Sequence, residues 1–218
     1  MAALPGADLT DDALLRELRI DGLDLTARTA RLVEMEACRF VGTSLAGSAL
    51  ERLQILDCVL EHCDLANVHL TSSALTRVEL TGCRATGLVA SGALLRNVTM
   101  RNCVADLSAF RFATFTAVRF VDCRLHGADF VSADLTGALF RRCDLSRAEL
   151  SQVRARGAVF VDCVWDGVHG VTSLAGATVV HSSPADAHAF MAATAESLGI
   201  AIGEPDDFPE PVREPAPG

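Results

Sequence analysis

Residues 121–150 divide into blocks of five that each end in a large apolar residue: VDCRL, HGADF, VSADL, TGALF, RRCDL and SRAEL. The same register runs without a slip from Phe40 to Trp165, and the closing residue of every block is apolar. The residue two places before it is small in nearly every block. A period of five fits neither an α-helix nor a β-strand, so the pattern predicts a repeated structural unit.

The cysteines show a longer period of twenty residues. Six of them form one series and the other two form a second: Cys63, Cys83, Cys103, Cys123, Cys143 and Cys163, then Cys38 and Cys58. Twenty residues make four blocks, which predicts a four-sided coil with one block per side. Successive coils would stack like parallel strands, about 4.8 Å apart.

All eight cysteines fall at the small position, where we interpret them as small buried hydrophobes. A metal-binding ladder is the alternative, but it would need ligands that converge tetrahedrally rather than line up along one axis. A disulfide between stacked neighbours is sterically open, because their Cα spacing would lie within about 4.4–6.8 Å.

The blocks resemble the repeats of the pentapeptide repeat proteins, in which a small residue and Asp or Asn precede Leu or Phe. The best matches are Cys63-Asp64-Leu65, Ala128-Asp129-Phe130, Ala133-Asp134-Leu135, Cys143-Asp144-Leu145 and Ala148-Glu149-Leu150. The resemblance implies an all-β solenoid, namely a right-handed quadrilateral parallel β-helix. The residue types agree with this fold, because a narrow shaft has room for one large and one small side chain per side.

Four segments are predicted along the chain. They are residues 1–37 as an N-terminal cap with an irregular first coil, 38–168 as the β-helix, 169–203 as a last strand and a helix, and 204–218 as a disordered, acidic, proline-rich tail. Thr10 to Arg19 is predicted to form a short capping helix with Thr10 as its N-cap.

A second helix is predicted to begin at Ser183-Pro184 and to end at Gly199. Its apolar side consists of Ala187, Phe190, Met191, Thr194 and Leu198. These residues either cap the last coil or make a homodimer contact. The second alternative rests on the resemblance, because the loop-free, gyrase-inhibiting members of the family pair through this end.

Composition and motifs predict neither a membrane protein nor an enzyme. No apolar run is long enough to span a bilayer, and the N-terminus lacks the features of a signal peptide, so we expect a cytoplasmic protein. The six histidines are scattered, no nucleophile, base and acid converge, and no glycine-rich phosphate loop is present. We therefore predict no catalytic residue, no cofactor and no metal site.

The net charge of −9 is concentrated at the two ends of the chain. Residues 1–37 carry −4, residues 38–168 carry +1 and residues 169–218 carry −6. Each side of the shaft mixes both signs, with Asp64 over Arg84 and Arg124 over Asp144 expected to form ion pairs between coils. Lysine is absent and no side is basic overall, so direct nucleic-acid binding is not expected.

The function predicted is a non-enzymatic one that depends on protein–protein interaction. The resemblance implies a DNA mimic that modulates bacterial DNA gyrase, as in quinolone-resistance members of the family, although a mimic needs a field of a single sign. The alternative is a rigid scaffold for another partner with no topoisomerase role. A candidate partner surface lies on one side near the carboxyl end and consists of Val121, Leu139, Val159 and Val161.

Overall fold

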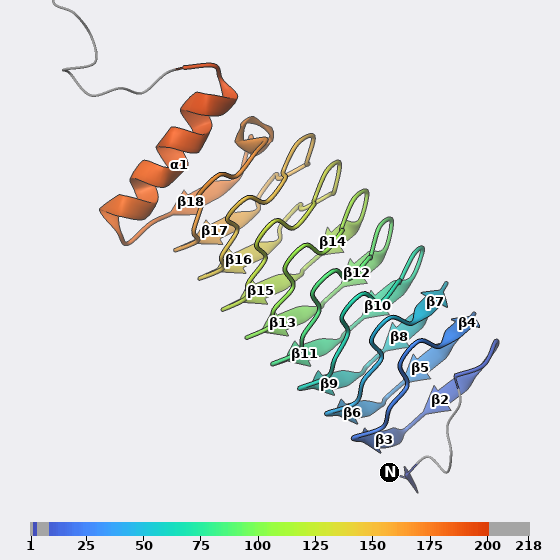
Figure 1. Ribbon diagram of the computed structural model, residues 1–218. Helices are drawn as coiled ribbons and strands as arrows, with labels where there is room; N and C mark the ends of the chain where they lie inside the picture. Colours follow the sequence, from blue (N-terminus) through green and yellow to red (C-terminus); the bar gives the residue numbers. More distant parts are fainter. Residues whose placement is uncertain (1, 4–8, 201–218) are drawn as a thin grey trace, which may run out of the picture.

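The structure is a computed structural model that describes residues 2–3 and 9–200. The chain winds into a parallel β-solenoid of about eight turns, with one α-helix at its C-terminal end (Figure 1). The predicted four-sided β-helix is therefore confirmed.

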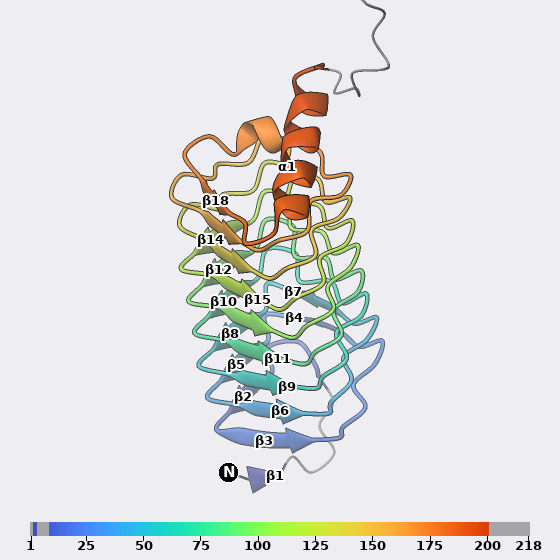
Figure 2. The ribbon, with the colours of Figure 1, turned by 90° about the vertical axis from the view of Figure 1, so that its left-hand side faces the viewer.

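One side of the solenoid carries a ten-stranded sheet, here called the long sheet (Figure 2). In order, its strands are β1 (Ala2–Ala3), β3 (Leu18–Asp21), β6 (Arg39–Val41), β9 (Val59–Glu61), β11 (Glu79–Thr81), β13 (Thr99–Arg101), β15 (Arg119–Val121), β16 (Leu139–Arg141), β17 (Val159–Val161) and β18 (Thr178–Val180).

The other sides carry shorter ladders. A six-stranded sheet contains β14 (Thr114–Thr116), β12 (Leu94–Arg96), β10 (Ala74–Thr76), β8 (Gln54–Leu56), β5 (Glu34–Glu36) and β2 (Leu14–Arg16), and a two-stranded sheet pairs β4 (Thr29–Arg31) with β7 (Ala49–Glu51). Elsewhere single bridges such as Asp64 with Arg84 continue the stack. From β3 to β17 every partner in the long sheet lies twenty residues away, as the cysteine spacing predicted.

The chain turns at each corner through a residue with positive φ. This residue lies two places after the apolar residue of the block, as at Asp122 (φ 55°), Gly137 (φ 70°) and Arg142 (φ 50°). Glycine adopts this conformation without strain, whereas other residues do so at a cost. The frequent glycines at these positions are therefore corner signals.

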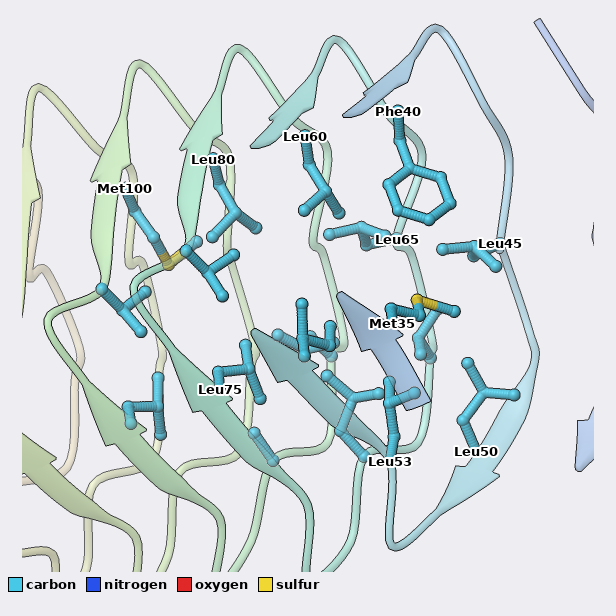
Figure 3. A pocket seen from close by; sticks show the side chains of 18 of the residues that line it. Met35, Phe40, Leu45, Leu50, Leu53, Leu60, Leu65, Leu75, Leu80 and Met100 are labelled. Carbon is cyan, nitrogen blue, oxygen red and sulfur yellow. The ribbon is translucent and has the colours of Figure 1, made fainter. Parts of the chain in front are cut away.

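The core is aromatic in its C-terminal half and aliphatic in its N-terminal half. Phe120, Phe140 and Phe160 stack in register, with ring centroids 4.9 and 4.8 Å apart and planes 8° and 7° apart. The half between Met35 and Phe110 has mainly leucines and encloses an apolar cavity of about 40 Å³ (Figure 3). Stacked phenyl rings fill the shaft more completely than leucines do.

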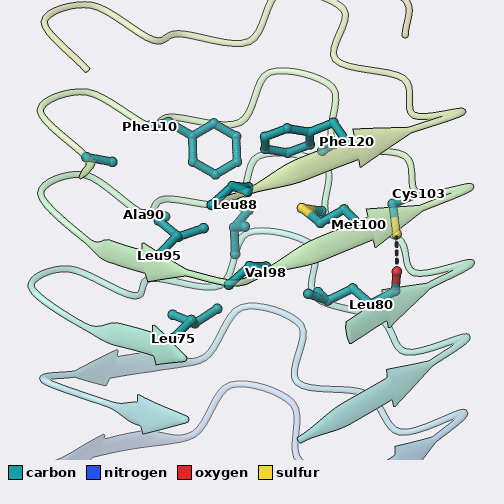
Figure 4. Packing of buried hydrophobic residues seen from close by; sticks show 14 of the residues in the cluster. Leu75, Leu80, Leu88, Ala90, Leu95, Val98, Met100, Cys103, Phe110 and Phe120 are labelled. Carbon is teal, nitrogen blue, oxygen red and sulfur yellow. Dashed lines mark hydrogen bonds between the residues drawn. The ribbon is translucent and has the colours of Figure 1, made fainter. Parts of the chain in front are cut away.

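All eight cysteines are buried, as predicted, and none of them forms a disulfide in the structure. Seven of the thiols also donate hydrogen bonds to carbonyl groups of the preceding coil, as from Cys103 Sγ to the Leu80 oxygen at 3.6 Å (Figure 4). Thr43 makes the equivalent bond to Ile20 at 3.2 Å. A donor at the small position therefore finds a carbonyl partner within the core, which explains why this position accepts Cys, Ser and Thr beside Ala and Val.

The helix predicted from Thr10 to Arg19 is wrong. Within this stretch Leu14–Arg16 forms β2, and β3 begins at Leu18. Leu15 pairs with Met35 and Ile20 with Phe40, so the pairing between coils overrides a local helical pattern. The first coil is consequently regular, not irregular, and no helix caps the N-terminal end within the described residues.

The C-terminal helix is α1 (Pro184–Ser197). As predicted, Ser183 caps it by accepting a hydrogen bond from the Ala185 amide at 3.2 Å, and Gly199 with φ 70° follows its end. A 3₁₀ turn, η1 (Val171–Ser173), precedes β18, and β18 is offset from β17 by nineteen residues rather than twenty. The predicted tail, residues 204–218, lies outside the described residues.

Candidate protein-binding surfaces

The C-terminal half of the long sheet has an outward face of unusual composition. It carries the outward side chains of β13, β15, β16, β17 and β18: Thr99, Arg101, Arg119, Val121, Leu139, Arg141, Val159, Val161, Thr178 and Val180. None of these residues is acidic. We call this surface the arginine–valine face.

The four residues predicted as a partner surface all lie on this face. Leu139 and Val159 are neighbours in one row, while Val121 and Val161 lie in the other row, on either side of Arg141. Leu139, Val159 and Val161 are partly exposed. The structure therefore brings all four onto one flat surface, as the five-residue register requires.

Val121 differs from the other three because only 8% of it is exposed. Its partners in register are Arg101 and Arg141, and Arg119 lies two residues earlier on the same strand. Long arginine stems commonly cover neighbouring apolar surface. Val121 thus forms the floor between the arginines rather than a direct contact point.

The three arginines on this face are exposed and form no ion pair with any described residue. Arg101 and Arg141 lie on strands two places apart in the sheet, about 10 Å from each other, and Arg119 lies between them.

Two corner carboxylates within electrostatic reach of Arg141 already accept other hydrogen bonds. Asp122 accepts two from Arg142, at 2.6 and 2.7 Å, and Asp162 accepts two from Ser182, both at 2.8 Å. The side-chain bond from Arg142 lowers the pKa of Asp122, and the bonds from Ser182 lower the pKa of Asp162. Both carboxylates therefore stay charged and engaged.

Counting charges by side hides this cluster, because the same sheet carries acids nearer its N-terminal end. Glu61 lies in the row of Arg101, and Glu79 lies in the row of Arg119. The side is mixed overall, but its charges are separated along the axis. Of the two ion pairs expected between coils, Arg84–Asp64 is confirmed, whereas Arg124 pairs with Asp106 instead of Asp144.

The C-terminal helix presents a second apolar surface. Of its predicted apolar side, Phe190 turns inward onto Trp165, while Ala187 and Thr194 are partly buried. Met191 and Leu198 point outward, with 57% and 59% exposed. The buried side is completed by Ala189 and Ala193, which the sequence pattern did not single out because alanine gives a weak apolar signal.

A metal site is not assembled in the part of the chain that the structure describes. No three His, Cys, Asp or Glu side chains there come close enough to hold a metal ion. The one α-helix among those residues is too short and too polar to cross a bilayer.

These features define a repeat solenoid. Family comparisons match a pentapeptide repeat region over residues 33–110 and pentapeptide repeats over 106–147 and 123–162. The chain belongs to the pentapeptide repeat family.

Solved structures of the same kind resemble this chain at low identity. HetL, a pentapeptide repeat protein involved in heterocyst differentiation regulation in the cyanobacterium Nostoc sp. strain PCC 7120, is 18% identical, with 77% of this chain and 87% of that chain covered and a TM-score of 0.44. A trypsin-treated form of QnrB1, a plasmid-mediated fluoroquinolone resistance protein, is 20% identical, with 91% and 98% covered and a TM-score of 0.43. A comparison with curated protein sequences finds no significant match.

Proposed function

We propose that this protein is a non-enzymatic rod that binds another protein through the arginine–valine face. The observation that carries this proposal is the juxtaposition of three unpaired arginines with Leu139, Val159 and Val161 on one face that has no acidic residue. Arginine and apolar residues are enriched at the centres of protein interfaces. The free thiols suit a reducing compartment such as the cytoplasm, where we place the protein.

The composition of the face defines the chemistry of the partner. Carboxylates would pair with the guanidinium groups, and apolar side chains would cover the leucine and the valines. The parallel backbone ladder holds these groups at a constant spacing, so little ordering is needed on binding. We therefore expect an acidic segment that also carries apolar residues.

Substitutions on matched positions of the same sheet test this function. Leu139→Asp with Val161→Asp places carboxylates on the face. Val59→Asp with Val41→Asp makes the same change in the same two rows nearer the N-terminus. A partner that co-purifies in stoichiometric amount with the wild type and the control, but not with the first variant, supports the proposal. Equal recovery by both variants would refute it.

DNA gyrase is the partner that the family resemblance suggests. The arginine–valine face argues against mimicry of a DNA duplex, since a basic patch opposes entry into a basic groove. A supercoiling assay with and without a fluoroquinolone separates the two alternatives. Inhibition or drug protection that the first variant abolishes would identify gyrase as the partner, whereas no effect at large excess would leave the scaffold role.

We also propose that two copies pair through the C-terminal end. The support is the outward position of Met191 and Leu198 on α1, with Val180 exposed on the neighbouring strand β18. Met191→Asp with Leu198→Asp should convert a dimer into a monomer in sedimentation equilibrium. The matched control is His188→Asp with Glu196→Gln, on exposed positions of the same helix, which should leave the mass unchanged. A wild type that is monomeric at high concentration would refute the proposal.

A further inference from the structure

The chain itself contains a segment of the composition that the arginine–valine face should bind. Residues 201–218 carry five carboxylates and one arginine: Glu204, Asp206, Asp207, Glu210 and Glu214, with Arg213. Phe208 and Val212 lie among these acids. Much of the negative charge of the protein is therefore in this stretch.

We propose that residues 204–218 dock on the arginine–valine face of the same molecule. The acids would pair with Arg101, Arg119 and Arg141. Phe208 would cover the neighbouring side chains Leu139 and Val159. The docking contact does not depend on the proposed function. Its consequence, competition between this segment and a partner for the same face, does.

The described part of the chain ends close enough for this contact. Helix α1 begins three residues after β18, and its fourteen residues extend about 21 Å, which places Ile200 near the C-terminal end of the rod (Figure 1). Arg141 lies two strands from β18 and Arg119 three, or about 10 and 14 Å along the axis. An extended chain spans about 3.3 Å per residue, so the stretch from Ile200 to Glu210 spans about 33 Å and that to Glu214 about 46 Å. These lengths suffice to return along α1 and to reach Arg141 and Arg119.

Two further features favour this segment as the occupant. Five of its fifteen residues are prolines, and proline leaves less backbone freedom to lose on binding. Opposite charges on the segment and the face also attract over about 10 Å at ordinary salt. A nucleic acid is the less favoured ligand for two reasons. Its phosphates would gain nothing from Leu139, Val159 and Val161, and the net charge of −9 on the whole protein would repel it.

Trypsin provides a test in the intact chain, because Arg213 is the one basic residue of residues 201–218. Docking should slow cleavage after Arg213 about fivefold relative to a synthetic peptide of residues 201–218, since cleavage follows the undocked fraction. Release of the terminal peptide, followed by mass spectrometry, is the readout. Raising the salt to about 0.5 M should restore the rate of the free peptide.

Charge reversal on the face should have the same effect as salt. Arg101→Glu with Arg119→Glu and Arg141→Glu should accelerate release about fivefold, to the rate of the peptide. Glutamates already occupy the same two rows at Glu61 and Glu79, so these positions accept the side chain, and circular dichroism verifies the fold.

The matched control reverses Arg52, Arg96 and Arg147, which lie on other sides, are exposed and form no ion pair with a described residue. Their reversal makes the same change in net charge and should leave cleavage slow.

Equal acceleration in both variants, or a wild-type rate equal to that of the peptide, would overturn the proposal. A rate that slows with protein concentration would assign the contact to a second copy, and DNA binding that only the face variant loses would assign the face to nucleic acid. Either result overturns docking within one molecule.

Discussion

The phenyl ring of Phe190 meets the indole ring of Trp165 edge to face, with centroids 4.9 Å apart and planes at 68°. Phe190 comes from α1, whereas Trp165 is the fully buried core residue of the last regular coil, in contact with Phe160. This contact joins the helix to the aromatic core. The open end of the solenoid is therefore closed by a helix rather than by another coil.

Phe190→Ala should lower the free energy of unfolding by about 2 kcal/mol, less than for a fully buried phenylalanine because the ring is partly exposed. Trp165 is the single tryptophan, so its fluorescence should shift to longer wavelength as water reaches it. His188→Ala, on the exposed side of the same helix, is the control and should change neither property. An unchanged emission spectrum in Phe190→Ala would contradict the capping role.

Two glycines with similar φ should differ sharply when replaced by alanine. Gly157 has φ 70° and no atom near an added Cβ, so Gly157→Ala should cost about 1–2 kcal/mol for the left-handed conformation alone. At Gly170, φ 75°, the Cβ would lie 2.3 Å from the Ser151 amide nitrogen, which belongs to the backbone. Urea denaturation should show that Gly170→Ala lowers the free energy of unfolding at least about twice as much as Gly157→Ala does. Equal losses of unfolding free energy in the two variants would mean that the last coil makes room for the added methyl group without strain.

The stacked cysteines should not react with a thiol reagent in the folded protein. All eight thiols are buried in the core, so a reagent cannot reach them while the coils stay closed. A thiol reagent should modify none of the eight cysteines in the native state and all eight in guanidinium chloride. Rapid native labelling would show that the coils open.

Two substitutions of Cys103 separate the contribution of its hydrogen bond to stability from that of its side-chain volume. Cys103→Ser should change stability by less than about 1 kcal/mol, because a hydroxyl can donate to the same carbonyl, as Thr43 does. Cys103→Leu should cost about 1–3 kcal/mol by overpacking. Thermal denaturation measures both, and a tolerated leucine would contradict the tight packing of this position.

Stability should fall in acid. The hydrogen bond from Arg77 lowers the pKa of Asp57, and the one from Arg142 lowers that of Asp122. Because these carboxylates bind protons less readily when folded, their contribution is complete above the unfolded pKa of about 3.9 and is lost as the pH falls through the lower folded values.

Melting temperatures between about pH 5 and pH 2 measure this dependence. Asp57→Asn with Asp122→Asn should flatten it. Asp166→Asn, which removes a carboxylate that has no ion pair among the described residues, is the control and should keep the wild-type slope. Identical slopes in the two variants would show that these ion pairs do not contribute.

The five-residue register by itself determined the architecture of this protein. It predicts which residues point inward, and together with the twenty-residue spacing of the cysteines it predicts four sides per coil and that Val121, Leu139, Val159 and Val161 share one side. These properties depend on local periodicity, which a linear sequence displays directly. The start and cap of α1 were equally readable, because Ser183 and Pro184 act on their own helix.

Only the tertiary structure decided which contacts these residues make with neighbouring coils and with α1. Leu14 and Leu15 fit a helical pattern, yet pairing with β5 makes them a strand, because coil stacking satisfies backbone groups that a short helix would leave open. Met191 and Phe190 share one apolar pattern, but the position of Trp165 turns one inward and leaves the other exposed. The arginine cluster around Val121 arises in the same way, because it joins side chains from neighbouring coils that find no ion-pair partner among the described residues.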